Sequence, residues 1–382
     1  MTSIGGAEMV DWNLAVATAT RLVRPGPEVT RDEARAVVAE LRRHARTSEE
    51  HVRAFTRMMP EGVTFPDTPV LVVDRAGWVK ANVAGFRELL GPLLGKMQDR
   101  RAGAPGGAVL GAVGGKVTGV ELGVLLSFLA SRVLGQYETF APGAPELLPG
   151  AGPTGGRLLL VAPNIVHVER ELEVAPHDFR LWVCLHEETH RTQFTAVPWL
   201  RAHLEGEIQT FLGATEMDPS TILERLREAV QSFSGARPEG ERGDEGRSLV
   251  ELVQTPEQRE VLSRLTAVMS LLEGHADFVM DGVGPDVVPS VAEIREKFQQ
   301  RRAAGAGRLD AALRKLLGLD AKLRQYRDGE RFVRAVVGQV GMDGFNRVWT
   351  SPNTLPTKAE IARPADWVAR VHGRGTVGSE ER

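Results

Sequence analysis

The chain has 382 residues, of which 42% are hydrophobic and 25% are charged, a balance typical of soluble globular proteins. Its 47 basic and 50 acidic residues leave a formal net charge of −3, so composition favours neither a nucleic-acid nor a membrane-surface partner. The single cysteine excludes an internal disulfide and any metal site built from several thiolates of this chain. A metal ion would therefore have to bind through histidine and carboxylate side chains.

Apolar residues at helical spacing predict a largely helical chain. In chain order, the helices are expected over residues 7–23, 31–58, 74–90, 109–135, 178–197, 256–281, 290–303, 308–326 and 329–341. Thr30 and Glu33 form a capping box at the start of the second helix, and Asp178 is expected to cap the fifth. Gly91-Pro92 should kink or end the third helix, because proline cannot donate the helical hydrogen bond.

Short β-branched or leucine-rich runs predict a few strands between these helices. The candidates are residues 69–73, 158–161 and 165–168, with a turn at Pro163-Asn164 between the last two. Residues 165–170 either form an edge strand that pairs with an extended peptide or simply pack within the fold. The expected fold class is therefore mainly α, or α+β with a few short strands.

Two breaks in composition suggest how the chain is divided. Residues 141–156 are rich in proline and glycine, and residues 232–248 are charged, glycine-rich and nearly free of aliphatic side chains. We expect an N-terminal helical subdomain over residues 1–140 and a catalytic subdomain over residues 141–372, with a mobile loop at 232–248. The last residues, 373–382, are expected to form a disordered tail.

Residues 109–135 are the most apolar long segment, and small residues recur there every four positions. They are Gly111, Gly115, Gly119, Gly123, Ser127, Ser131 and Gly135. Such a ridge lets another backbone approach closely, so we expect a buried central helix, packed within the subunit or against a second one. Three charged residues interrupt the segment, which falls short of the ~20 apolar residues of a membrane span. The N-terminus lacks a secretory signal pattern, so we expect a cytoplasmic protein without a membrane partner.

Residues 186–190 read His-Glu-Glu-Thr-His, an HExxH motif within an apolar helical stretch. His186 and His190 are four residues apart, so both can present a ring nitrogen to one zinc ion from the same helical face. Glu187 lies about 100° around the helix, where it can reach a metal-bound water without being a ligand. Cys184 should point back into the core. The alternative reading is two ordinary histidines on an amphipathic helix.

A catalytic zinc site needs a third protein ligand, and the best candidate is Glu273 in the segment LLEGHAD. Asp277, four residues later, could accept a hydrogen bond from a ligand histidine. His275, Tyr326, Tyr137 and Arg324 are candidates to stabilise a developing oxyanion. The competing third ligands are His203, Glu205, Glu207 and His275 itself.

Two other metal classes fit the sequence less well. Metzincins continue the motif as HExxHxxGxxH, but Gln193 and Ala196 occupy the last two of these positions, which excludes that class. A di-iron carboxylate bundle needs two ExxH pairs, and only Glu187 and His190 form one.

These residues resemble the gluzincin type of zincin metallopeptidase, in which a downstream Glu, with an Asp four residues later, completes HExxH. The chain also resembles a family of bacterial proteins described as hydrolases or zinc-dependent metallopeptidases, some associated with deazaflavin-coenzyme biosynthesis. The matching stretches are residues 73–82, 132–140, 179–194, 271–281, 322–332 and 363–371. The resemblance implies a zincin-like fold, Zn²⁺ as cofactor, His186, His190 and Glu273 as ligands, and Glu187 as base.

The sequence therefore predicts a zinc-dependent hydrolase that acts on a peptide or other amide bond. Zinc would activate a water molecule and polarise the scissile carbonyl, while Glu187 would move the proton. Two alternatives are a zincin-like binding scaffold without hydrolysis and an accessory protein in coenzyme biosynthesis. The sequence identifies neither the substrate nor the oligomeric state.

Overall fold

The computed structural model describes residues 10–58, 69–102, 107–140, 156–213, 255–304 and 319–373, apart from the side chains of some residues within its helices. The predicted mobile loop at 232–248 lies outside these ranges, as does the predicted tail from residue 374. Of the helices in the described ranges, none has both the length and the apolar content that a membrane crossing needs.

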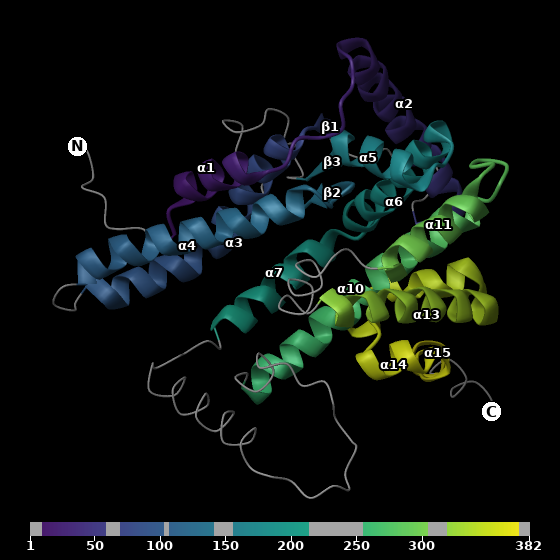
Figure 1. Cartoon of the computed structure of the whole chain (residues 1–382). Coiled ribbons are helices and arrows are strands. Elements are labelled where there is room, and N and C mark those ends of the chain that lie inside the picture. Colours follow the sequence, from purple (N-terminus) through teal and green to yellow (C-terminus); the bar gives the residue numbers. More distant parts are fainter. Residues whose placement is uncertain are drawn as a thin grey trace, which may run out of the picture. The chain divides into compact units, whose positions relative to one another are not determined.

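The expected mainly helical fold with a few short strands is confirmed (Figure 1). The helices are α1 Trp12–Leu22, α2 Arg31–Thr56, α3 Arg75–Ala102, α4 Gly107–Ala130, α5 Ala162–Leu172, α6 Pro176–Ala196, α7 Pro198–Gly213, α10 Pro256–Gly282, α11 Val291–Ala304, α13 Leu319–Phe345, α14 Lys358–Ala362 and α15 Pro364–His372. Short 3₁₀ turns follow at η1 Asn346–Trp349 and η2 Pro352–Thr354. The strands are β1 Val70–Val73, β2 Gly135–Glu138 and β3 Arg157–Val161.

Contacts between residues group the chain into two compact units. The first comprises Met1–Arg201 and His275–Gly305, and the second comprises Ala202–Gly274 and Ala306–Arg382. Helix α10 belongs to both, since the boundary falls between Gly274 and His275 of one continuous helix. This grouping does not test independent folding, so the division expected at residue 140 stays a prediction.

A three-stranded sheet forms the centre of the first unit. Its order is β1-β3-β2, with β1 parallel and β2 antiparallel to the central strand β3. All five residues of β3 are buried, and successive side chains of a strand point to opposite faces. Leu158 and Leu160 join one apolar cluster with α2, α5 and α6, whereas Leu159 and Val161 join another with α1, α3 and α4. The sheet is therefore covered by helices on both faces.

The prediction of a strand at residues 165–168 is wrong, because these residues belong to helix α5. Pro163 lies in the first turn, where the missing N–H has no helical partner to lose. The Asn164 side chain donates to the carbonyls of Ala130 and Val133, at 2.8 and 2.6 Å. What reads as an extended apolar run is thus the buried face of a short helix, and it cannot serve as an edge strand.

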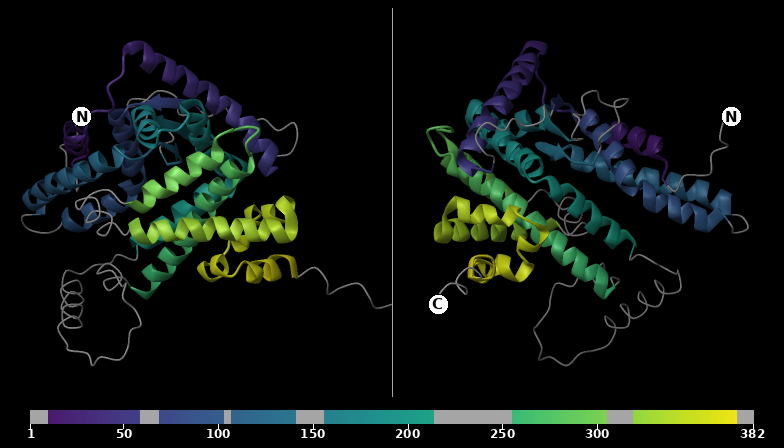
Figure 2. Two further views of the ribbon diagram at one scale, coloured as in Figure 1. Left: turned by 45° about the vertical axis from the view of Figure 1, so that its right-hand side comes forward. Right: turned by 180° about the vertical axis from the view of Figure 1, so that it is seen from behind.

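The small residues of helix α4 let another backbone approach closely, so this part of the prediction is confirmed. A Cβ atom on Gly119 would lie 2.6 Å from the Asp11 carbonyl oxygen, and one on Gly123 would lie 2.6 Å from Thr18 Cβ, so α1 packs directly on the ridge. The view from behind shows α1 lying along α4 (Figure 2). Two other parts of the prediction are wrong. The opposite face is exposed at Val117, Val120 and Val124, and the helix ends at Ala130, so Gly135 begins strand β2 instead.

Two predicted helix boundaries also need correction. Helix α3 does not end at Gly91-Pro92 but runs on to Ala102. Helix α6 begins with Pro176 after the N-cap residue Ala175, so Asp178 is not its cap. The Asp178 carboxylate instead accepts from Ser290 N at 2.8 Å and from Ser290 Oγ at 2.7 Å, which ties the first turn of α6 to the start of α11.

In the second unit, α13 packs with α14 and α15 around a tryptophan. Trp367 is fully buried, its ring meets Phe332 edge to face, and its Nε1 donates to the Thr354 carbonyl at 2.8 Å. Helices α10 and α13 approach closely where two glycines meet. A Cβ atom on Gly274 would lie 2.1 Å from the Gly329 carbonyl carbon.

Candidate metal centre

Helix α6, in the first unit, places the two motif histidines side by side. Their Nε2 atoms lie 3.2 Å apart, and their rings meet edge to face with centroids 4.8 Å apart. Four ligands at 2.0–2.1 Å around a tetrahedral zinc lie about 3.3 Å from one another. The spacing of the two nitrogens therefore suits a shared metal ion. Both side chains are partly exposed, so a substrate can reach them.

On the side of helix α6 away from the two histidines, buried contacts with α2 hold the helix in place. Cys184 is fully buried in the core, as expected, with Sγ 3.8 Å from the Leu41 carbonyl oxygen, and burial raises the pKa of its thiol well above the usual value. Arg191 donates to Glu188 at 2.8 Å and to Glu49 of α2 at 2.6 Å. Burial raises the pKa of Glu188 to about 8. The helix that carries the motif is thus held in place by both apolar and charged contacts.

A chain of polar contacts orients the His190 ring. Its Nδ1 lies 2.9 Å from Gln193 Oε1, and the other amide atom, Gln193 Nε2, lies 3.0 Å from His275 Nδ1. An amide oxygen only accepts and an amide nitrogen only donates, so the His190 proton resides on Nδ1 and its Nε2 keeps the lone pair that a metal needs. His275 is fully buried, and burial followed by the nearby His190 lowers its pKa to about 3. It is therefore neutral and accepts from Gln193.

The His186 ring faces the C-terminal part of α10. Its Nδ1 lies 3.3 Å from the Met280 sulfur and 3.9 Å from Asp277 Oδ1. The second distance is within ion-pair range but beyond a hydrogen bond. Asp277 is thus near the ring that it was expected to orient, and its role as a hydrogen-bond acceptor stays a prediction.

Glu187 lies against strand β2, next to a glycine. Its side chain is 6% exposed, and a Cβ atom on Gly135 would lie 2.5 Å from Glu187 Cγ and 2.6 Å from Cδ. Only glycine at this position leaves room for the carboxylate where it stands. The four-residue spacing of small residues places Gly135 at the end of a helical ridge and so does not predict this contact. Gln193 departs from the metzincin pattern, and nothing else in the sequence distinguishes it.

Glu273 completes a group of three side chains that could hold a metal. One ligand atom from each of His186, His190 and Glu273 lies within 4.8 Å of the others. Glu273 reaches this position along α10, one helical turn before Asp277 and therefore on the same face of that helix. Two imidazole nitrogens and one carboxylate oxygen, all partly exposed, match the donor set of a catalytic zinc with an open position.

Further candidates from the sequence lie on helices α7 and α13. His203, Glu205 and Glu207 lie on α7, and the Arg264 guanidinium donates to Glu207 at 2.9 Å. Within the described ranges, the group that contains both motif histidines includes none of these three residues. Tyr326 falls on α13, but its side chain lies outside the part of the chain that the structure describes.

Tyr137 of β2 stacks on Phe194 of α6, with ring centroids 5.7 Å apart. Burial raises the pKa of its phenol to about 12, so it keeps its proton.

Two comparisons agree on the kind of protein that this chain resembles. A family model described as zincin-like metallopeptidase matches residues 10–368. A crystal structure from Chloroflexus aurantiacus, described as "a putative hydrolase with a novel fold", is 31% identical to the chain with a TM-score of 0.65. The match covers 95% of this chain and 99% of that one. Among curated proteins, no sequence is significantly similar.

Proposed function

Because the chain belongs to the zincin-like metallopeptidase family, we propose that it is a zinc-dependent hydrolase that cleaves a peptide or other amide bond. The observation that carries the proposal is the group formed by His186, His190 and Glu273. The residue after His186, Glu187, packs closely against Gly135 of strand β2. We assign the first three residues as metal ligands and Glu187 as general base.

The residues around this group have distinct tasks in such a reaction. A zinc ion held there supplies a Lewis acid that polarises the scissile carbonyl and lowers the pKa of a water molecule to about 7. The Glu187 carboxylate takes a proton from the attacking water and delivers it to the leaving nitrogen, so that one O–H and one C–N bond break while a C–O and an N–H bond form. Gln193 holds His190 with its Nε2 lone pair directed away from the amide.

Strand β2 offers a surface for an extended substrate. It lies at the edge of the sheet and begins at Gly135, directly beside Glu187. Main-chain pairing with an edge strand tolerates many sequences, as a peptidase requires. This role replaces the one considered for residues 165–170. We assign His275 to the support of His190 through Gln193, because its ring is fully buried. The candidates for the oxyanion donor are then Tyr326, Tyr137 and Arg324.

Replacing Glu187 by Gln tests the proposal directly. The amide keeps the volume of the side chain but cannot take a proton, so we expect unchanged zinc content and a loss of hydrolysis of about 10²–10⁴-fold on a panel of fluorogenic peptides and N-acyl amides. Glu205→Gln, at an exposed carboxylate on α7, is the matched control and should keep full activity. A wild-type protein that binds zinc stoichiometrically but hydrolyses no member of the panel would favour the non-catalytic scaffold instead.

A further inference from the structure

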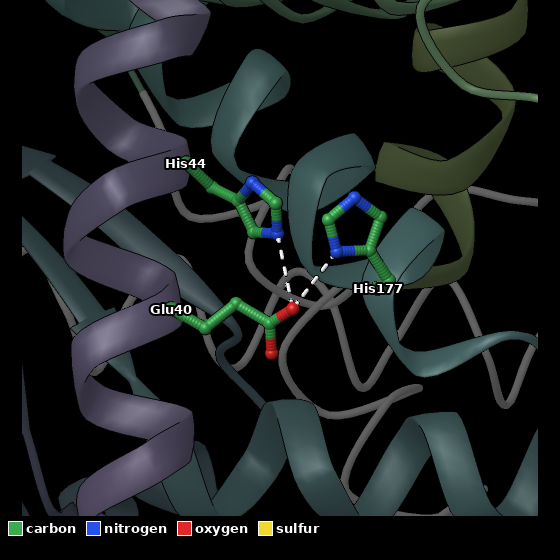
Figure 3. Close-up of side chains that lie close together, drawn as sticks. All are labelled: Glu40, His44 and His177. Carbon is green, nitrogen blue, oxygen red and sulfur yellow. Dashed lines mark hydrogen bonds and ion pairs between the residues drawn. The ribbon is translucent and has the colours of Figure 1, made fainter.

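A second group of potential ligands lies in the first unit, away from the HExxH motif (Figure 3). Glu40 and His44 are one turn apart on α2, and His177 is in the first turn of α6. Glu40 Oε1 lies 2.9 Å from His177 Nδ1 and 3.5 Å from His44 Nε2. The three ligand atoms all lie within 4.8 Å of one another. Figure 3 shows both rings turned toward the same carboxylate oxygen.

The His44 ring is the feature that a packing role does not explain. It is 7% exposed, and its Nε2 faces Glu40 Oε1 at 3.5 Å, with no shorter hydrogen bond to any residue in the described ranges. A buried nitrogen whose nearest polar contact is this long is poorly satisfied, and a metal ion between the ring and the carboxylate would satisfy it. His177 Nδ1 is directed at the same carboxylate oxygen, so the two imidazole nitrogens and the oxygen converge as metal ligands do.

The charges around the group also favour a cation. The second oxygen of Glu40 accepts from Arg180 Nη1, which leaves Oε1 directed at the two rings. Arg180 also donates to both oxygens of Glu169, which is 4% exposed. Arg180 is shared by the two carboxylates, so Glu40, Glu169 and Arg180 together carry a net negative charge that favours a cation. Carboxylate ligands of metals are commonly held by a hydrogen bond of this kind.

We propose that Glu40, His44 and His177 form a second divalent-metal site that joins α2 to the start of the motif helix α6. Two imidazoles and one carboxylate suit Zn²⁺ or a similar transition metal rather than Mg²⁺ or Ca²⁺, which take oxygen ligands. His177 is largely exposed, so water can complete the coordination. His177 and His186 are nine residues apart on one helix, about 13 Å along its axis, which is too far for a two-metal catalytic centre. The site is therefore structural.

Zinc stoichiometry in the wild type and two variants tests this site. Metal-free full-length protein is titrated with Zn²⁺ by calorimetry, and bound zinc is counted by mass spectrometry after gel filtration. Wild type should bind two equivalents, and His177→Ala should bind one. The matched control is His167→Ala, another exposed histidine of the first unit that lies 3.9 Å from a glutamate, and it should bind two. Because His177 is largely exposed, its replacement should leave the circular dichroism spectrum unchanged.

A variant without the motif histidines separates this inference from the proposed function. His186→Ala/His190→Ala should keep one equivalent, which disappears when His177→Ala is added. Loss of all zinc from the motif variant, or two equivalents retained by His177→Ala, would show that the three residues form only a hydrogen-bonded cluster. If wild type binds a single zinc that His177→Ala removes and His186→Ala does not, the second site stands and the proposed catalytic site fails.

Discussion

The two ring nitrogens of each motif histidine have different partners, and these partners decide which nitrogen can bind a metal. In His190, the Gln193 amide oxygen lies against Nδ1, and the amide nitrogen is engaged by the buried His275. Rotating the amide would place its NH₂ group against the His190 nitrogen and its oxygen against His275. In the orientation that the structure shows, the amide oxygen accepts from His190 Nδ1 and the amide nitrogen donates to His275 Nδ1, and this orientation sets the His190 tautomer.

Replacing Gln193 by Ala should weaken zinc binding at the motif by about 10–100-fold, because the His190 ring loses the partner that holds its Nδ1 proton. Calorimetric titration of the metal-free variant measures this change. Gln300→Ala, at an exposed residue of α11, should leave zinc affinity unchanged. Gln193→Glu should recover part of the loss, since a carboxylate also accepts from Nδ1. Equal affinity in Gln193→Ala and wild type would exclude the orienting role.

Replacing Gly135 by Ala should lower turnover while zinc still binds. The new Cβ would have to lie 2.5 Å from Glu187 Cγ, so the carboxylate must move, and a displacement of about 1 Å can reduce the rate about 100-fold. Steady-state hydrolysis and zinc content are measured on the same preparation. Gly91→Ala is the control, since a Cβ atom there meets no atom within 4 Å. Unchanged turnover in Gly135→Ala would show that Glu187 does not depend on this strand.

At the scale of elements, the sequence predicts structure well where one periodicity dominates. The long amphipathic helices and the buried strand β3 follow directly from their apolar spacing. Residues 165–168 resemble a strand because three of these four residues are β-branched or apolar. The contacts of Asn164 with residues 130 and 133, which accompany the start of helix α5, come from the fold and cannot be read from this stretch of sequence. Strand β2 is missed because GQYE carries no apolar run, and its pairing with β3 comes from the fold.

Replacing Gly123 by Ala should destabilise the packing of α1 on α4. The added methyl group would lie 2.6 Å from Thr18 Cβ and 2.8 Å from the Ala15 carbonyl oxygen, so the two helices must separate, at a cost of about 1–3 kcal/mol. Gly95→Ala on α3 meets no atom within 4 Å and should instead stabilise the protein by about 0.5–1 kcal/mol. Urea unfolding gives both free energies. Equal stability of the two variants would contradict the role of the ridge.

At the scale of the whole molecule, helix α10 shows what spacing along the sequence cannot predict. HExxH is recognisable because its chemistry fits within five residues of one helix. Glu273 lies 83 residues after His190, and only the course of α10 brings its carboxylate into the same group. Spacing does not predict such a long-range approach, which is why several third ligands remain open from the sequence alone. The Glu40, His44 and His177 group is distributed over two helices in the same way.

The course of α10 depends in turn on a glycine contact with α13. A Cβ atom on Gly329 would lie 1.9 Å from the Ser270 carbonyl oxygen, so Gly329→Ala must push α10 away near Glu273. We expect a loss of about 1–3 kcal/mol in unfolding free energy, together with weaker zinc binding at the motif. Gly338→Ala on the same helix meets no atom within 4 Å and should preserve both properties. If Gly329→Ala loses stability but keeps its full zinc affinity, Glu273 is not the third ligand, because the metal then does not depend on the part of α10 that carries it.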